Sequence, residues 1–67
     1  MQTCHKLEKS IQNEDYKKIK EYAHMIKQSN KVNTELRKVA FKIELEARKR
    51  NSEKIHTLFK ELKGGIL

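Results

Sequence analysis

The stretch Ser29-Asn30-Lys31-Val32-Asn33-Thr34 decides how this chain folds, because it is the strongest turn signal in a sequence that otherwise favours helix. Ser, Asn and Thr side chains compete with helical hydrogen bonds and favour turns and helix caps. Asn33 or Thr34 is expected to cap the next helix, with Glu35 in its first turn. The chain is therefore expected to form a helical hairpin around this turn.

After the turn, two apolar stripes follow each other at helical spacing. They are Leu36, Val39, Ala40, Ile43 and Ala47, and then Ile55, Leu58, Phe59 and Leu62. On one ideal helix the second stripe is rotated from the first by about 80–100°. We predict one long helix over residues 34–63, either continuous or kinked near residues 51–53, where Ser52 is a candidate cap. Gly64-Gly65 is expected to end it.

Before the turn, the chain is expected to form a broken arm. Cys4, Leu7 and Ile11 are spaced as on one helix face and predict a helix over residues 3–11. Residues 12–15 interrupt the pattern, and Asn13 is a candidate cap for a second helix over residues 14–28. The apolar face of that helix comprises Tyr16, Ile19, Tyr22, Ala23 and Ile26.

These elements predict an all-α fold in a single small domain over residues 1–67. It is a helical hairpin with a broken N-terminal arm and a long C-terminal helix. No stretch alternates apolar and polar residues with period two, so strands have no support. A chain of 67 residues buries only about 60% of its unfolded surface. We therefore expect a homodimer, in which two hairpins complete a four-helix arrangement.

Composition excludes several classes of protein. No apolar run approaches the roughly 20 residues of a membrane span, and no apolar core marks a secretory signal in the first 15 residues. We therefore expect an intracellular, non-secreted protein with no membrane partner. The single cysteine, Cys4, cannot form an internal disulfide.

Basic residues concentrate in the middle of the chain. Sixteen Lys and Arg against nine Asp and Glu give a net charge of +7, and every arginine lies between residues 37 and 50. Residues 37, 38, 42, 48 and 49 fall within an arc of about 140° on a helical wheel. Such an arc is typical of a helix that lies along a phosphate backbone, although it also suits a solvated face that keeps a small protein soluble. The candidate nucleic-acid contacts are Lys31, Arg37, Lys38, Lys42, Arg48, Lys49 and Arg50.

Phe41 and Leu45 point into this basic arc rather than into the apolar stripe. They are the candidate partner interface, either with a second copy of the chain or with another molecule.

No residue pattern indicates catalysis. Cys4, His5, His24 and His56 lack the paired spacing of a zinc site, and neighbours in sequence such as Cys4 and His5 point apart on a helix. The acids are dispersed, and Gly64-Gly65 follows a helix instead of opening a phosphate loop. We therefore expect neither an enzyme nor a cofactor or metal. Tyr16 and Tyr22 are either stacking platforms for single-stranded nucleic acid or core residues with their hydroxyls at the rim.

One stretch resembles a known family, the linker-histone-like nucleoid proteins of some intracellular bacteria and their short relatives in bacteriophages. The matching residues are Ile26-Lys27-Gln28-Ser29-Asn30-Lys31, Arg37-Lys38, Ala40, Ile43-Glu44-Leu45-Glu46 and Arg48. The resemblance covers about residues 18–55. It implies a helical hairpin that compacts DNA without sequence preference, with Lys31, Arg37, Lys38 and Arg48 as phosphate contacts.

The sequence thus favours a small basic protein that binds nucleic acid, with duplex DNA as the expected ligand, in the cytoplasm or on the nucleoid. The alternative is a viral or regulatory helical protein that binds or inhibits an acidic or grooved protein partner through Phe41 and Leu45. A coiled-coil piece of a larger assembly is a third interpretation, but no heptad pattern runs over four repeats.

Overall fold

The computed structural model describes residues 2–66 of the chain, and side-chain burial over residues 3–65. Within that range the chain is all-helical and contains four helices and no strands. They are α1 (Gln2–Gln12), α2 (Tyr16–Gln28), α3 (Thr34–Lys49) and α4 (Ser52–Ile66). All-α structure is therefore confirmed.

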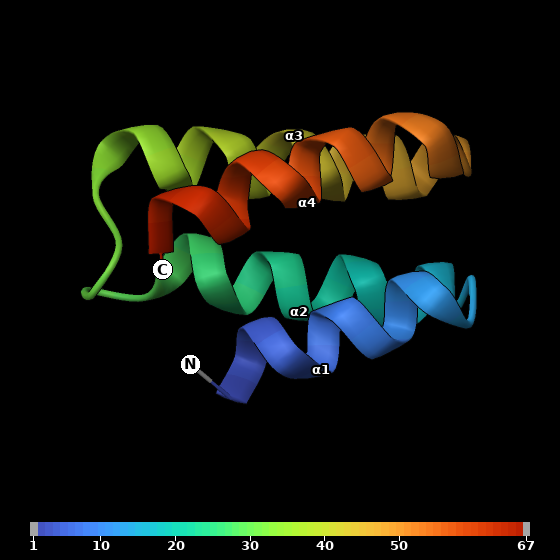
Figure 1. The fold of residues 1–67 in the computed structure, drawn as a ribbon, viewed down its shortest axis with the longest axis horizontal. Helices are drawn as coiled ribbons and strands as arrows, with labels where there is room; N and C mark the ends of the chain where they lie inside the picture. The colour runs from blue at the N-terminus through green and yellow to red at the C-terminus, as the bar shows by residue number, and fades with distance from the viewer. Residues whose placement is uncertain (1, 67) are drawn as a thin grey trace.

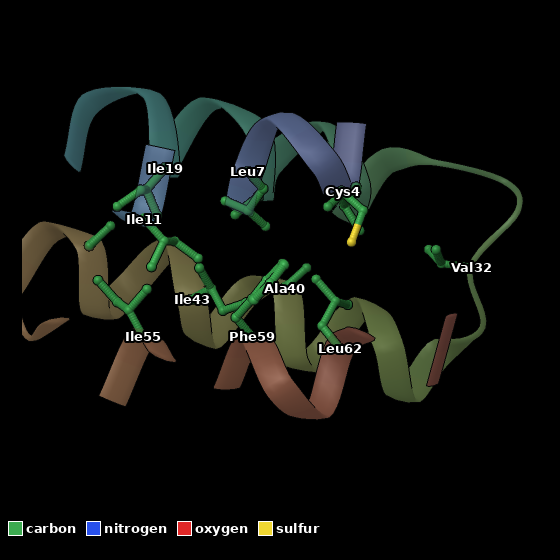
Figure 2. Packing of buried hydrophobic residues seen from close by; sticks show 13 residues of the cluster. Cys4, Leu7, Ile11, Ile19, Val32, Ala40, Ile43, Ile55, Phe59 and Leu62 are labelled. Carbon is green, nitrogen blue, oxygen red and sulfur yellow. The ribbon is translucent and has the colours of Figure 1, made fainter. Parts of the chain in front are cut away.

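The helices form a bundle in which each helix runs antiparallel to the one before it (Figure 1). α2 packs on α1 and α3, α4 packs on α3, and a smaller contact between α4 and α1 closes the ring. All four helices supply the core, in which Leu7, Ile19, Ile43 and Ile55 are almost completely buried. Figure 2 shows these side chains converging between the helices.

The single helix predicted over residues 34–63 is wrong, because the chain reverses direction at Arg50 and Asn51. Arg50 adopts the left-handed conformation with φ 57° and ψ 36°. Its N–H donates to the Ala47 carbonyl at 3.1 Å, and the Asn51 N–H donates to the Glu46 carbonyl at 3.0 Å. This pair of hydrogen bonds is the Schellman ending of a helix.

The reversal explains why the two apolar stripes did not align. On one straight helix they face different directions, whereas on antiparallel α3 and α4 both face the same core. One chain thereby provides the four helices that two hairpins were expected to provide. The core does not require a second copy, and dimerisation stays a prediction.

The predicted helices over residues 3–11 and 14–28 correspond to α1 and α2, with a different cap between them. Asp15, not Asn13, is the N-cap of α2, and its side chain accepts a hydrogen bond from the Lys18 N–H. Before it, Glu14 has φ 53°, and the N–H groups of Glu14 and Asp15 donate to the carbonyls of Ile11 and Ser10. α1 therefore ends in the same Schellman geometry as α3.

The ends of α4 also differ from expectation. The Asn51 side chain, not Ser52, accepts from the Lys54 N–H at 3.3 Å and caps the helix. Gly64 and Gly65 do not end α4, which continues to Ile66. A side chain at Gly65 would clash with Leu36, whereas Gly64 has open space around it. Gly65 thus lets the end of α4 approach α3 closely.

Candidate nucleic-acid interface

All seven predicted nucleic-acid contacts are exposed to solvent and lie on or beside α3. We call them the basic face: Lys31, Arg37, Lys38, Lys42, Arg48, Lys49 and Arg50. Lys31 lies in the loop before α3, Arg50 lies in the turn after it, and the other five are on the helix. The face therefore extends along the whole of α3.

The outward arc of α3 has a definite order around the helix axis. At 100° per residue, Arg37 and Arg48 lie toward α2, Lys38, Lys42 and Lys49 lie toward α4, and Phe41 and Leu45 lie between the two rows. The acids of α3 lie outside this arc of about 140°, and the exposed Glu35 lies at its border, about 20° from Lys42. Glu44 is directed toward α2, where it meets Lys27, and Glu46 lies beside α4 in a shared groove. The outward arc consequently presents positive charge around a narrow apolar centre.

Some of these basic side chains have weak partners within the protein. The nearest oxygen–nitrogen distances are 3.9 Å for Arg48 to Glu44 and 3.7 Å for Lys49 to Glu46. Arg37 donates to the backbone carbonyl of Ser29 at 3.2 Å and so links the loop to α3. Exposed pairs of this kind contribute only about 0.3–0.5 kcal/mol, so a phosphate could replace them at little cost.

Glu44 joins α3 to α2 at the edge of the basic face. Its Oε1 atom lies 3.0 Å from Lys27 Nζ and 3.6 Å from His24 Nδ1. Burial of the carboxyl group by itself raises its pKa, but the hydrogen bond and charge of Lys27, together with His24, outweigh that effect. The pKa of Glu44 is therefore lowered from its ordinary value of 4.5. Glu44 stays ionised and cancels positive charge on the α2 side.

Phe41 is 46% exposed, and the Lys27 ammonium lies 5.0 Å from the centre of its ring. A cation at this distance from an aromatic face is attracted to it. Lys27 therefore holds Phe41 in place while also binding Glu44. Sequence reasoning found Phe41 but missed Lys27, His24 and Glu44, since a contact between residues 17 positions apart leaves no local pattern.

Leu45, the second predicted interface residue, is half-buried at the edge of a groove between α3 and α4. The groove has a volume of about 520 Å³. Its lining comprises Lys42, Leu45, Glu46, Asn51, Glu53, Lys54, Thr57 and Leu58. Phe41 therefore lies beside α2, whereas Leu45 lies beside α4.

The remaining candidates for chemistry are separate from this face. Cys4 is buried in the core, and burial raises the pKa of its thiol. Tyr16 and Tyr22 pack against the core, which supports their interpretation as core residues instead of stacking platforms.

Within residues 2–66, no group of three or more His, Cys, Asp or Glu side chains could hold a metal ion. A second, polar hollow of about 250 Å³ between α1 and α2 includes Lys6, Lys9 and Lys18.

Comparison of the chain with protein-family models, curated proteins and solved structures finds no match. Among the described residues, no helix has the length and apolar character needed to cross a membrane.

Proposed function

We propose that this protein binds nucleic acid, with duplex DNA as the expected ligand, through the basic face and without sequence specificity. One observation supports the proposal above all: the outward arc of α3 contains five basic residues and no acid. The fold does not use these side chains in its core. Exchange of their counterions for phosphates is the main source of non-specific affinity.

The dimensions of α3 suit this role. Its 16 residues span about 24 Å, which equals about seven steps of 3.4 Å along one DNA strand. Arginine pairs with phosphate in a fork geometry, and lysine adds mobile positive charge. The resemblance to linker-histone-like nucleoid proteins agrees with the proposal, and a nucleoid-associated location would follow from it.

Binding to duplexes of unrelated sequence across a salt series tests the proposal. Five phosphate contacts predict a slope of about −4 to −5 in log K against log salt. The variant Lys38→Gln/Lys42→Gln should weaken binding to all duplexes alike and flatten the slope by about 2. Both lysines are exposed, and within residues 2–66 neither forms an ion pair, so the fold should survive.

The matched control is Lys17→Gln/Lys60→Gln, which removes the same charge from exposed positions on α2 and α4. It should leave most of the affinity and the slope unchanged. Equal behaviour of the two double variants would mean that the basic face serves solubility alone. A single-stranded RNA arm distinguishes the ligands, since the slope per contact is about −0.7 for single strands.

The alternative function, a helical protein that binds another protein, is favoured by the exposed ring of Phe41 and by the groove beside Leu45. An exposed aromatic side chain and an adjoining groove are common features of protein-binding surfaces. In that case, duplex affinity at physiological salt should be low.

A further inference from the structure

Phe41 is an exposed aromatic residue that lies outside the core cluster. The Lys27 ammonium lies over its ring, 5.0 Å from the centre. Lys27 is itself held by Glu44, with 3.0 Å between Nζ and Oε1. With both contacts in place, Phe41 is still 46% exposed. The ring is therefore fixed in position and remains accessible to another molecule.

The surroundings of this ring are mainly basic. The adjoining basic side chains are Lys27 on α2 and Arg37, Lys38 and Lys42 on α3. Glu44 is the one acid within a turn of Phe41 on α3, and its side chain is 10% exposed and already paired with Lys27. The exposed acids Glu35 on α3 and Glu21 on α2 lie farther away, each about 120° around its own helix from Phe41 or Lys27. The accessible ring thus lies in an excess of positive charge.

Apolar surface does not extend far from Phe41. Leu45, its nearest apolar neighbour on the outward arc of α3, is half-buried on the side of α4. Among residues 3–65, Met25 is the one other large apolar residue that is exposed, and it lies about 160° from Lys27 around α2. The core of a protein–protein interface is larger, more apolar and depleted in charge. A single ring bordered by cations instead matches a ligand that combines an aromatic face with anions, which is a nucleobase on its phosphate backbone.

We propose that Phe41 stacks on an unpaired base, so that the protein prefers duplex DNA with an unpaired base to fully paired duplex. In a paired duplex the neighbouring base pairs cover both faces of each base, and α3 meets only sugar and phosphate. An unpaired base can leave the stack and pack on an aromatic side chain, while Arg37 and Lys42 hold phosphates on either side of the ring. The inference rests on the proposed function and adds to it the class of DNA that binds best.

The test compares dye-labelled duplexes of about 20 base pairs, which at 3.4 Å per step extend beyond α3. One is fully paired, one has an extra adenine in the middle of one strand, and one has an abasic residue at the same place. The abasic duplex retains the backbone and the charge of the adenine duplex but offers no base for stacking. Fluorescence anisotropy with the full chain should show at least about fivefold tighter binding of the adenine duplex than of the abasic duplex.

Variants of the protein assign the preference to the ring. Phe41→Leu removes the aromatic face but retains an apolar side chain, and it should bind the adenine and abasic duplexes equally. Its salt slope on paired duplex should match that of the parent, because no charge has changed. Phe41→Tyr should retain the preference for adenine. The matched control is Met25→Leu, which changes an apolar side chain that is 54% exposed on α2, and it should behave like the parent.

Tryptophan fluorescence gives a second, direct measurement of stacking. The sequence contains no tryptophan, so Phe41→Trp introduces a single reporter that can itself stack on a base. A base stacked on an indole quenches its fluorescence. At saturation the adenine duplex should therefore quench the Phe41→Trp variant more strongly than the abasic duplex does. Met25→Trp is the control, and the two duplexes should affect it equally.

The outcomes separate this inference from the proposed function. Equal affinity of the parent for the adenine and abasic duplexes, with a steep salt slope, overturns the stacking and leaves the proposed function intact. A preference for adenine that persists in Phe41→Leu also overturns the stacking. Absence of affinity for every duplex overturns the proposed function and the stacking with it. A parent dimer that Phe41→Asp converts to a monomer likewise overturns the stacking, because a second copy of the chain would then cover the ring.

Discussion

Arg50 occupies a backbone conformation that most residues avoid. Its φ of 57° lies in the left-handed region, where a Cβ atom crowds the following carbonyl, and Glu14 adopts a similar φ of 53° at the end of α1. Glycine is the usual residue at such helix ends. The chain therefore tolerates local strain at both turns, which the Schellman hydrogen bonds and the packing beyond them offset.

Replacing Arg50 with glycine should relieve that strain. We expect Arg50→Gly to raise the free energy of unfolding by about 0.5–1 kcal/mol. Relief of the backbone strain stabilises the folded protein, and the greater conformational freedom of glycine in the unfolded chain offsets part of that gain. Urea denaturation would measure the change. Arg50→Gln is the control, because it loses the same charge but retains Cβ, and its stability should match the parent. A destabilised Arg50→Gly variant would contradict the role given to the left-handed conformation.

At the scale of the helices, caps decide where each element begins. The Asn33 side chain accepts a hydrogen bond from the Leu36 N–H at 2.9 Å, and Thr34 is the first residue of α3. The sequence named both Asn33 and Thr34 as candidate caps, and the cap is Asn33, not Thr34. Only the backbone shows which of the two is the last residue outside the helix.

Asn33→Ala should lower the free energy of unfolding by about 1 kcal/mol, because the Leu36 N–H loses its acceptor. Thr34→Ala should change it by less than about 0.5 kcal/mol, since the side chain is exposed and makes no contact that caps the helix. The two variants are compared by denaturant midpoint under one set of conditions. The opposite ranking would place the N-cap at Thr34.

For the whole molecule, Glu44 is the clearest polar link between helices. The Glu44 side chain is 10% exposed, and its carboxylate meets Lys27 and His24 of the neighbouring helix α2. Its pKa is lower in the folded protein than its ordinary value of 4.5. An acid of this kind contributes stability that is fully present above the unfolded pKa and is lost as pH falls through the folded pKa.

We expect Glu44→Gln to reduce stability at pH 7 by about 1–3 kcal/mol, the range for a hydrogen bond to a charged group. The deficit relative to the parent should shrink as pH falls below about 4.5, because the parent then loses the same interaction. Thermal melts from pH 7 to pH 3 would follow this change. Glu61→Gln, at an exposed position, is the control and should follow the parent at every pH. A constant deficit across the range would exclude ionisation as its cause.

The amino-acid sequence alone determined the helical class, the main turn and most of the core. Leu7, Ile19, Ile43 and Ile55 were all placed on apolar stripes and are all buried. Helical spacing reveals such residues because a helix repeats its faces every 3.6 residues. The same rule placed Phe41 and Leu45 outside the apolar stripe of α3. In the structure Phe41 is exposed and Leu45 is half-buried.

The tertiary structure decided the rest. The local sequence does not strongly predict the reversal of the chain at Arg50, because the residue in the left-handed conformation is not glycine. The reversal is favoured because it lets both apolar stripes reach one core. Contacts between distant residues, such as Lys27 with Glu44 and Phe41, exist only once α2 lies beside α3. The groove between α3 and α4 likewise requires the reversal. Sequence periodicity specifies the faces of each helix, whereas packing determines which faces meet.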